Sequence, residues 1–306
     1  MIPIYFAPLQ GYTEDAYRRL HHNIVGGVDA YFTPFIRWEH NNVRSKDMRD
    51  IRPEFNEGVP IVPQVIVDSA KELEALVNII ASHGYKHINI NMGCPFPLQT
   101  RHGKGAGLLT QPETVEEICN YINQKSDIAF SVKMRLGLND ENEWKNILPI
   151  LNDTPLEHIT LHPRIASQQY KGTVNMNAFD EFMQQCRHPL IYNGDILTLQ
   201  QVNSLESQHP NLTGIMIGRG LLAHPTLAME YKTGKTVTDN ELINIIKQIH
   251  SQLLAHYATV IPSESQQLTK IKTYWDFMEN TIGRKAWKRI KKAGNMKNYL
   301  SAINDI

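Results

Sequence analysis

The fold of the whole chain is predicted from one stretch, His87-Ile88-Asn89-Ile90-Asn91-Met92-Gly93-Cys94-Pro95. Its alternation predicts a strand with polar side chains on one face and apolar ones on the other, ended by the glycine and the proline. Cys94 then lies on a loop at the strand's carboxyl end. A helix-covered open sheet should be apolar on both faces, so the polar face favours a barrel interior with a polar ligand at its mouth. Taken alone, the segment slightly favours an inert, buried cysteine.

Short apolar or alternating runs recur along the first three quarters of the chain. Most are separated by helix-like patterns, such as those that begin after Asp68-Ser69 and at Gln111-Pro112. This alternation over about 230 residues predicts a (β/α)8 TIM barrel rather than a doubly wound open sheet, which has fewer strands in that length. The eight expected strands are Ile2–Ala7, Ala30–Phe35, Ile61–Ile66, His87–Asn91, Ile128–Met134, His158–His162, Leu190–Asn193 and Gly214–Ile217.

The pattern changes after the eighth strand. Thr238 and Glu241 have the spacing of a capping box in front of an apolar helical stripe that runs to Leu253. Two further helical stretches are expected, around 267–282 and 284–293, and no strand pattern reappears. We therefore predict a barrel domain over residues 1–236 and a small all-helical domain over residues 237–306.

Composition places the chain among ordinary globular proteins, with 306 residues, 42% of them hydrophobic and 20% charged. The widely spaced Cys94, Cys119 and Cys186 suit neither a zinc site nor a disulfide framework, which favours the cytoplasm. Neither a basic leader nor a long apolar run is visible, so export and membrane insertion are not expected. Nothing points to an obligate protein partner or to a metal.

Charge is unevenly distributed although the formal net charge is zero. Residues 237–306 hold 10 Lys and Arg against 6 Asp and Glu, whereas residues 1–236 hold 21 against 25. Within the tail, a local basic surface is formed by Arg284, Lys285, Lys288, Arg289, Lys291, Lys292 and Lys297. Such a surface usually is a solvated helix face, and alone it does not establish a nucleic-acid partner.

Polar residues gather at the carboxyl ends of the expected strands, where barrels of this type carry their functional groups. Any one of them could be structural, but buried polar groups without partners would each cost about 1–3 kcal/mol, and a bound polar ligand would satisfy them together. The glycine-containing loops after strands seven and eight suit a phosphate, with Arg219 as a charged contact. Flavin mononucleotide (FMN) fits both ends of this set: Gln64, Cys94, Ser131, Lys133, Arg135, His162, Arg164, Asn193, Gly194, Asp195, Gly218 and Arg219.

Seven motifs in order resemble those of the tRNA-dihydrouridine synthases. The resemblance spans the barrel, and that family also has a helical C-terminal domain. Leu9 replaces the usual Met, and Pro163 stands where the family usually has a glycine. The motifs are Ala7-Pro8-Leu9-Gln10-Gly11-Tyr12-Thr13, Asn91-Met92-Gly93-Cys94-Pro95, Gly105-Ala106-Gly107-Leu108-Leu109, Ser131-Val132-Lys133-Met134-Arg135-Leu136-Gly137, His162-Pro163-Arg164, Asn193-Gly194-Asp195 and Met216-Ile217-Gly218-Arg219-Gly220.

The resemblance implies FMN-dependent reduction of the C5=C6 bond of a D-loop uridine in tRNA, with NADPH or NADH as electron donor. Cys94 would protonate C5 after hydride transfer to C6, because an ordinary thiol is mostly protonated at neutral pH. The alternative, a nucleophilic Cys94, would need a base such as His102. The implied FMN residues are Pro8, Leu9, Gln10, Gln64, Lys133, His162, Asn193, Gly194, Asp195, Gly218 and Arg219. The implied substrate and tRNA residues are Asn91, Arg135, Arg164, Arg284, Lys288, Lys291 and Lys292.

Three other functions are compatible with parts of the pattern. A flavin barrel that acts on a free pyrimidine, like a dihydroorotate dehydrogenase, would not need the basic helical tail. A barrel that only binds RNA would have no use for Cys94 and Lys133, and a flavin colour would exclude it. A phosphate-binding lyase or isomerase would have no use for the Cys94 loop. The motifs leave open which D-loop uridine is reduced and which nicotinamide donor is preferred.

Overall fold

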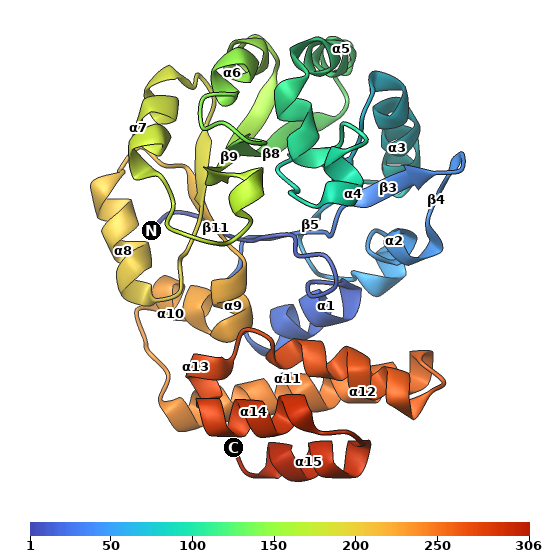
Figure 1. Cartoon of the computed structure of the whole chain (residues 1–306), viewed down its shortest axis with the longest axis vertical. Coiled ribbons are helices and arrows are strands. Elements are labelled where there is room, and N and C mark those ends of the chain that lie inside the picture. The colour runs from blue at the N-terminus through green and yellow to red at the C-terminus, as the bar shows by residue number, and fades with distance from the viewer.

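In the computed structural model, which describes residues 1–306, one parallel sheet curls into a barrel (Figure 1). Its strands are β1 Ile4–Phe6, β2 Ala30–Phe32, β5 Ile61–Val62, β6 Gln64–Ile66, β7 His87–Met92, β8 Ala129–Gly137, β9 Leu156–Ile165, β10 Leu190–Asn193 and β11 Gly214–Ile217. Strands β5 and β6 are two halves of one strand, separated by Pro63, which has no N–H to donate. β5 pairs with β2 and β6 with β7, so the ring of eight strands closes. The predicted (β/α)8 barrel is confirmed.

All eight predicted strands are present, but a hairpin that the sequence did not indicate extends the second one. The chain continues past Pro34 into β3 (Ile36–Glu39), which pairs with β6 and then turns back into the antiparallel β4 (Asn42–Val43). His40 and Asn41 form the turn with φ of +53° and +59°. Two-residue turns of this kind usually contain glycine, so the sequence lacks the signal that would have announced the hairpin.

Helices surround the barrel, most of them on its outside (Figure 1). They are α1 Asp15–Ile24, α2 Ser45–Arg49, α3 Ala70–Ser82, α4 Pro97–Thr100, α5 Pro112–Asn123, α6 Trp144–Asn152, α7 Met176–Gln185, α8 Leu199–Gln208, α9 Arg219–Ala223 and α10 Leu227–Thr233. In α3, the predicted stripe of Leu73, Leu76, Val77 and Ile80 is buried, and Ser69 caps the helix by accepting a hydrogen bond from Glu72 N. The periodicity thus located both the helix and its buried face.

The last part of the chain is entirely helical and packs beneath the barrel (Figure 1). Its helices are α11 Asp239–Val260, α12 Glu264–Lys272, α13 Glu279–Ile282, α14 Arg284–Lys292 and α15 Met296–Asn304. The capping box of α11 is confirmed, since Glu241 N donates to Thr238 Oγ1 at 3.3 Å and Thr238 N donates to Glu241 Oε2 at 2.7 Å. No helix of the chain combines the length and the apolarity that a membrane span requires.

Two details of this region differ from expectation. The stretch around 267–282 is not one helix, because a 3₁₀ turn at Thr273–Trp275 separates α12 from α13 and turns Trp275 into the core, where its Nε1 donates to Tyr299 Oη at 2.8 Å. Helix α15, which supplies Tyr299, was not expected. The boundary expected between residues 236 and 237 falls in the link between α10 and α11, and a division into separate domains there stays a prediction.

Candidate active site

A pocket of about 440 Å³ opens at the carboxyl ends of the barrel strands, within the usual size range for small-molecule sites. Strand ends from around the ring contribute to its lining. Most of the residues expected in the site line it: Pro8, Leu9, Gln10, Asn91, Cys94, Lys133, Arg135, His162, Asn193, Gly194, Asp195, Gly218 and Arg219. Gln64 and Arg164 lie behind this surface, and the cations of α14 lie outside it.

Hydrogen bonds to its backbone groups fix the loop that carries Cys94. Asn91 Oδ1 accepts hydrogen bonds from Gly93 N at 3.0 Å and from Cys94 N at 2.8 Å. On the other side, Ala106 N donates to Cys94 O at 3.1 Å. Gly105 allows this approach, because it has φ of +60° and a Cβ there would lie 2.9 Å from Cys94 Cβ. The Gly105-Ala106-Gly107 motif therefore serves to support the Cys94 loop.

Inside the barrel, a ladder of hydrogen bonds runs up to Asn91. Ser131 Oγ lies 2.8 Å from His87 Nε2 and accepts from Asn89 Nδ2 at 2.8 Å. Gln64 Nε2 donates to Asn89 Oδ1 at 2.7 Å, and Gln64 Oε1 accepts from Asn91 Nδ2 at 2.8 Å. Register explains the ladder, because Gln64 lies opposite Asn89, and Asn89 lies opposite Ser131, on neighbouring strands. The polar face of β7 is thus satisfied mainly by other strands rather than by a ligand.

This ladder orients Asn91 and, through it, Cys94. Because Asn91 Nδ2 donates to Gln64, its Oδ1 must face the N–H groups of the Cys94 loop. Gln64 is fully buried, so its position gives it a role in orienting Asn91. Direct contact between Gln64 and a cofactor stays a prediction.

Arg135 joins the Cys94 loop to the loop that follows β9. Its Nε donates to Gly93 O at 3.0 Å, and its Nη1 donates to Ile165 O at 3.0 Å and to Gln169 O at 2.8 Å. The side chain is 3% exposed yet contributes to the pocket wall. Arg135 therefore holds two loops of the pocket together, and its expected contact with substrate stays a prediction.

Lys133 presents a half-buried ammonium group to the pocket with no hydrogen-bond or ion-pair partner. Burial lowers the pKa of Lys133 to about 7, the nearby charge of Arg135 lowers it as well, and Cys94 opposes the shift. Because Lys133 has no anionic partner in the protein, an anionic group of a ligand could pair with it.

Cys94 is a half-buried thiol that favours its protonated form. Burial raises its pKa above the ordinary value, while the backbone at Phe96 and the charges of Arg135, Lys133 and Arg37 act in the opposite direction. No imidazole is among the groups that act on it, and His102 is exposed. The surroundings of Cys94 therefore favour a proton donor over a thiolate nucleophile.

His162 is neutral, and its tautomer follows from its neighbour. Burial, followed by the charges of Arg135, Lys133, Arg164 and Arg219, lowers the pKa of His162 well below its ordinary value. Its Nε2 lies 3.1 Å from Nη1 of Arg164, and a guanidinium can only donate. The proton of His162 consequently resides on Nδ1, which is free to donate to a ligand.

The wall formed by the ends of β10 and β11 is cationic. Asp195, at φ of +45°, accepts from Arg164 Nη1 at 3.0 Å and from Arg219 Nη2 at 2.9 Å. Arg164 is 1% exposed and also donates to Gly172 O at 2.6 Å, so it supports this wall from behind. Because Arg164 and Arg219 share the single carboxylate of Asp195, the wall keeps a net positive charge beside Gly194 and Gly218. The wall is suited to an anionic group.

The cations expected to contact tRNA lie on α14, outside the pocket. Arg284, Lys288 and Lys292 are exposed, and the opposite face buries Ile290. Arg284 makes one exposed ion pair, with Nε 3.5 Å from Glu279 Oε1. Lys291, in contrast, is half-buried, donates from Nζ to Lys272 O at 3.1 Å and pairs with Asp276. It already has partners within the helical region.

Five aromatic residues line the pocket although the sequence did not single them out. They are Tyr12, Phe35, Phe96, Tyr170 and Phe277. Tyr170 contacts the guanidinium of Arg219, with the ring centroid 4.1 Å from Cζ. Tyr12 lies in the first motif, which was a usable signal. Phe277 comes from the helical region, and no local pattern indicates that it reaches the barrel.

Comparison with known proteins gives consistent matches. A family model described as "Dihydrouridine synthase (Dus)" matches residues 5–305. The chain is 25% identical to "tRNA-dihydrouridine(16) synthase" of Neisseria meningitidis, over 91% of this chain and 86% of that protein. It is 29% identical to "Probable tRNA-dihydrouridine synthase 2" of Bacillus subtilis, over 82% of this chain and 78% of that protein.

Among solved structures, histamine dehydrogenase from Rhizobium sp. 4-9 shares the fold, with a TM-score of 0.60 and 11% identity. The match covers 81% of this chain and 48% of that one, so it spans about half of the dehydrogenase chain.

Proposed function

The chain belongs to the dihydrouridine synthase family, and we propose that it reduces the C5=C6 bond of a D-loop uridine in tRNA to 5,6-dihydrouridine, with FMN as cofactor and NADPH or NADH as electron donor. The observation that carries this proposal is one pocket that holds both the Cys94 thiol, which favours its protonated form, and the unpartnered Lys133 amino group, which an anionic ligand would keep charged. A reductase of a conjugated carbonyl needs an acid for the substrate and a cation for the cofactor. We place the reaction in the cytoplasm.

The residues of the pocket fit FMN. The unpartnered Lys133 and the Nδ1–H of His162 suit the polar edge of a flavin ring, and the ring side would also meet Pro8, Leu9 and Gln10. Arg219, with Asn193, Gly194, Asp195 and Gly218, would hold the phosphate. A cation beside the ring favours its anionic reduced form. When bound, the flavin supplies the hydride that reduces C6 of the uracil.

Cys94 completes the reduction in this proposal by a proton transfer from its Sγ to C5 of the uracil. The transfer forms a C–H bond at C5, breaks the S–H bond and leaves a thiolate. Arg135 and Lys133, whose charges lower the Cys94 pKa, stabilise that thiolate. Because Cys94 is only half-buried, solvent can return the proton before the next turnover.

Asn91 positions the reacting groups. Its Oδ1 is committed to Cys94 N, and one N–H of its Nδ2 is committed to Gln64, which leaves the second N–H for a uracil carbonyl. Arg135 fixes the same loop through Gly93 O. Both residues therefore hold the thiol in place relative to a base in the pocket.

The target base must leave its stack to reach this pocket, as enzymes that act on bases require. The rest of the tRNA would be held through its phosphates, which position without reading sequence. We assign these contacts to the exposed cations Arg284, Lys288 and Lys292 of α14. Lys291 would contribute only if it left Asp276.

Anaerobic mixing of the NADPH-reduced protein with unmodified tRNA tests this function. We expect flavin bands that bleach with NADPH and recover on addition of tRNA but not of free uridine. Cys94→Ala should be reduced by NADPH at the normal rate but should be reoxidised by tRNA about 10²- to 10⁴-fold more slowly, the usual contribution of a general acid. Reoxidation of Cys94→Ala at the wild-type rate would contradict the role of Cys94, and a colourless protein that takes up no FMN would contradict the whole proposal.

A further inference from the structure

The loop that follows β1, residues 7–14, lines the pocket with Pro8, Leu9, Gln10 and Tyr12. The helical region contacts this loop directly. Within the loop, Tyr12 N and Thr13 N both donate to Leu9 O at 3.0 Å, and Leu9 N donates to Thr13 Oγ1 at 2.9 Å, but none of these hydrogen bonds involves Gln10 or Gly11. A loop this short on backbone hydrogen bonds needs support from its surroundings to keep one conformation.

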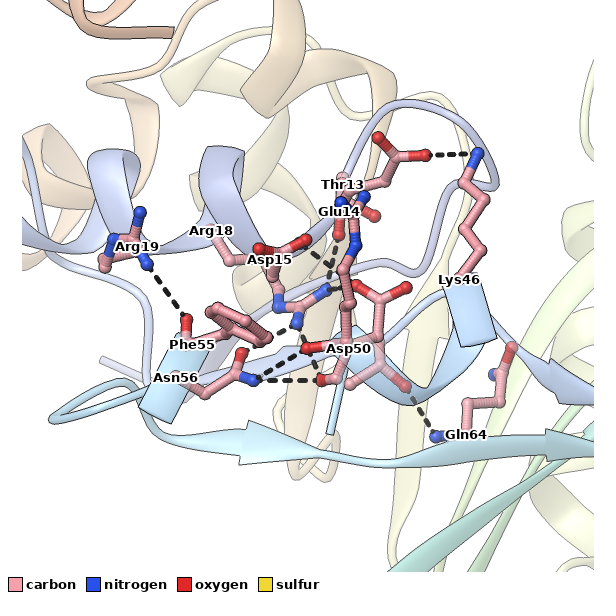
Figure 2. A network of polar contacts seen from close by, with 12 residues as sticks. Thr13, Glu14, Asp15, Arg18, Arg19, Lys46, Asp50, Phe55, Asn56 and Gln64 are labelled. Carbon is pink, nitrogen blue, oxygen red and sulfur yellow. Dashed lines mark hydrogen bonds and ion pairs between the residues drawn. The ribbon is translucent and has the colours of Figure 1, made fainter. Parts of the chain in front are cut away.

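The barrel fixes the far end of this loop (Figure 2). Arg18 Nη1 donates to Thr13 O at 2.7 Å and to Asp50 Oδ1 at 2.8 Å. Glu14 points toward Lys46, whose Nζ lies 2.8 Å from Glu14 Oε1. These contacts hold residues 13 and 14, but they do not reach Gly11 or Tyr12.

Lys270, in α12, holds the middle of the loop. Its Nζ donates to Gly11 O at 2.9 Å and lies 2.7 Å from Glu14 Oε2. Gly11 has φ of +87°, a conformation that glycine adopts readily and that directs its carbonyl to Lys270. Burial would raise the pKa of Glu14, but Lys270 and Lys46 together lower it below its ordinary value, so the carboxylate stays charged at neutral pH.

Asp276 and Phe277, just after the 3₁₀ turn, hold Tyr12. The Tyr12 hydroxyl donates to Asp276 Oδ2 at 2.9 Å, and the rings of Tyr12 and Phe277 lie 5.1 Å apart, both at the pocket wall. Burial and then Asp276 raise the pKa of Tyr12 to about 12, so the hydroxyl remains a donor throughout the physiological range. Lys291 pairs with the other oxygen of Asp276 and fixes the carboxylate.

We propose that the helical region is a structural part of the cofactor pocket, in which Lys270 and Asp276 are positioning residues that hold the loop after β1 in its binding conformation. The inference rests on the proposed function in one respect, the identity of the ligand as FMN. It assigns to the helical region a task separate from tRNA binding, because Lys270 and Asp276 face the barrel. Cofactor affinity should therefore depend on residues that the cofactor does not touch.

The test removes the Tyr12–Asp276 hydrogen bond from either side. Tyr12→Phe deletes only the hydroxyl and leaves the ring against Phe277, whereas Asp276→Leu deletes the acceptor and also releases Lys291. The matched control is Asp305→Leu, because Asp305 pairs with Arg289 in the same helical region but contacts no residue of the loop. The two readouts are the FMN dissociation constant of the apoprotein, from fluorescence quenching, and hydrogen exchange at the Tyr12 and Thr13 amides without FMN.

We expect Tyr12→Phe to weaken FMN binding about 10-fold, the effect of losing a hydrogen bond to a charged group, and to speed amide exchange in the apoprotein. The double variant Tyr12→Phe/Asp276→Leu should bind FMN no more weakly than Asp276→Leu alone, because both changes break one bond. Asp305→Leu should match wild type in both readouts.

Normal FMN affinity and normal amide exchange in Tyr12→Phe would overturn the positioning role, even if Asp276→Leu folds poorly. Effects that add in the double variant would also overturn it. Failure of the proposed function can be told apart from failure of this inference. A wild-type protein that binds no FMN would refute FMN as the cofactor, whereas faster amide exchange in Tyr12→Phe would still support the positioning role of Asp276.

Discussion

Replacing Arg18 by methionine should destabilise the fold strongly. The Arg18 side chain is fully buried, and its Nη2 donates to Asp50 O at 2.9 Å and to Asn56 Oδ1 at 2.8 Å, in addition to the bonds from Nη1 to Thr13 O and Asp50 Oδ1. Methionine keeps much of the apolar volume but none of the donors. Breaking a buried ion pair from one side costs about 3–5 kcal/mol, a large part of the roughly 5–15 kcal/mol that separates most folded proteins from their unfolded states.

Urea unfolding followed by tryptophan fluorescence measures this loss. With an m-value of about 3 kcal/mol per molar urea, the midpoint of Arg18→Met should fall by about 1 M or more. The control is Arg19→Met, because Arg19 makes a single hydrogen bond, from Nη1 to Phe55 O at 3.4 Å. It should change stability by about 0.5 kcal/mol or less. Equal midpoints for the two variants would refute the argument that the Arg18 network stabilises the barrel.

The loss of stability in Arg18→Met should also depend on pH. Burial raises the pKa of Asp50 to about 6 even though Arg18 opposes the shift. Without Arg18 the pKa rises further, so folded Asp50 binds a proton that the unfolded chain, with an ordinary carboxyl pKa near 4, has released. Stability then falls as pH rises through the folded pKa. The deficit of Arg18→Met relative to wild type should be smaller at pH 6 than at pH 8.

Three further predictions concern the pocket and the basic helix. The Lys133→Met apoprotein should melt at a higher temperature than wild type at pH 7, because folding lowers the Lys133 pKa to about 7 and so disfavours the charged lysine. The difference in melting temperature should shrink as pH rises toward 10. The flavin bound to this variant should have a reduction potential lower by about 30 mV or more, measured by dye equilibration. Removing three exposed cations of α14 should flatten the slope of log affinity for tRNA against log salt by up to about 2, from filter binding, with the flavin spectrum unchanged. Those three cations are Arg284, Lys288 and Lys292. Gly220→Ala should fail to retain FMN on gel filtration, because a Cβ there would lie 2.0 Å from Ile196 O, whereas Gly294→Ala, with open space around it, should behave as wild type.

Local patterns carried much of the fold and of the site. Apolar or alternating runs located the eight barrel strands, which are buried on both faces, and helical periodicity located α3 and α5, which each bury one apolar face. Motifs at strand ends placed Cys94, Lys133 and His162 in one pocket, because parallel strands in a closed barrel bring their carboxyl ends together. The ladder from His87 to Asn91 also follows from alternation, but the partners of each amide depend on register between strands, which no single strand encodes.

What the sequence determined by itself is therefore the set of elements, their order and the chemistry at their ends, because periodicity, caps and turn residues act over a few neighbouring residues. Tertiary structure alone decided which distant groups meet. The hydrogen bond from Tyr12 to Asp276 joins positions 264 residues apart. The break after α12 brings Asp276 to that place, because Trp275 packs into a core that α15 completes. Burial and partner geometry of that kind are properties of the assembled fold, so the wall that Phe277 adds to the pocket could be found only there.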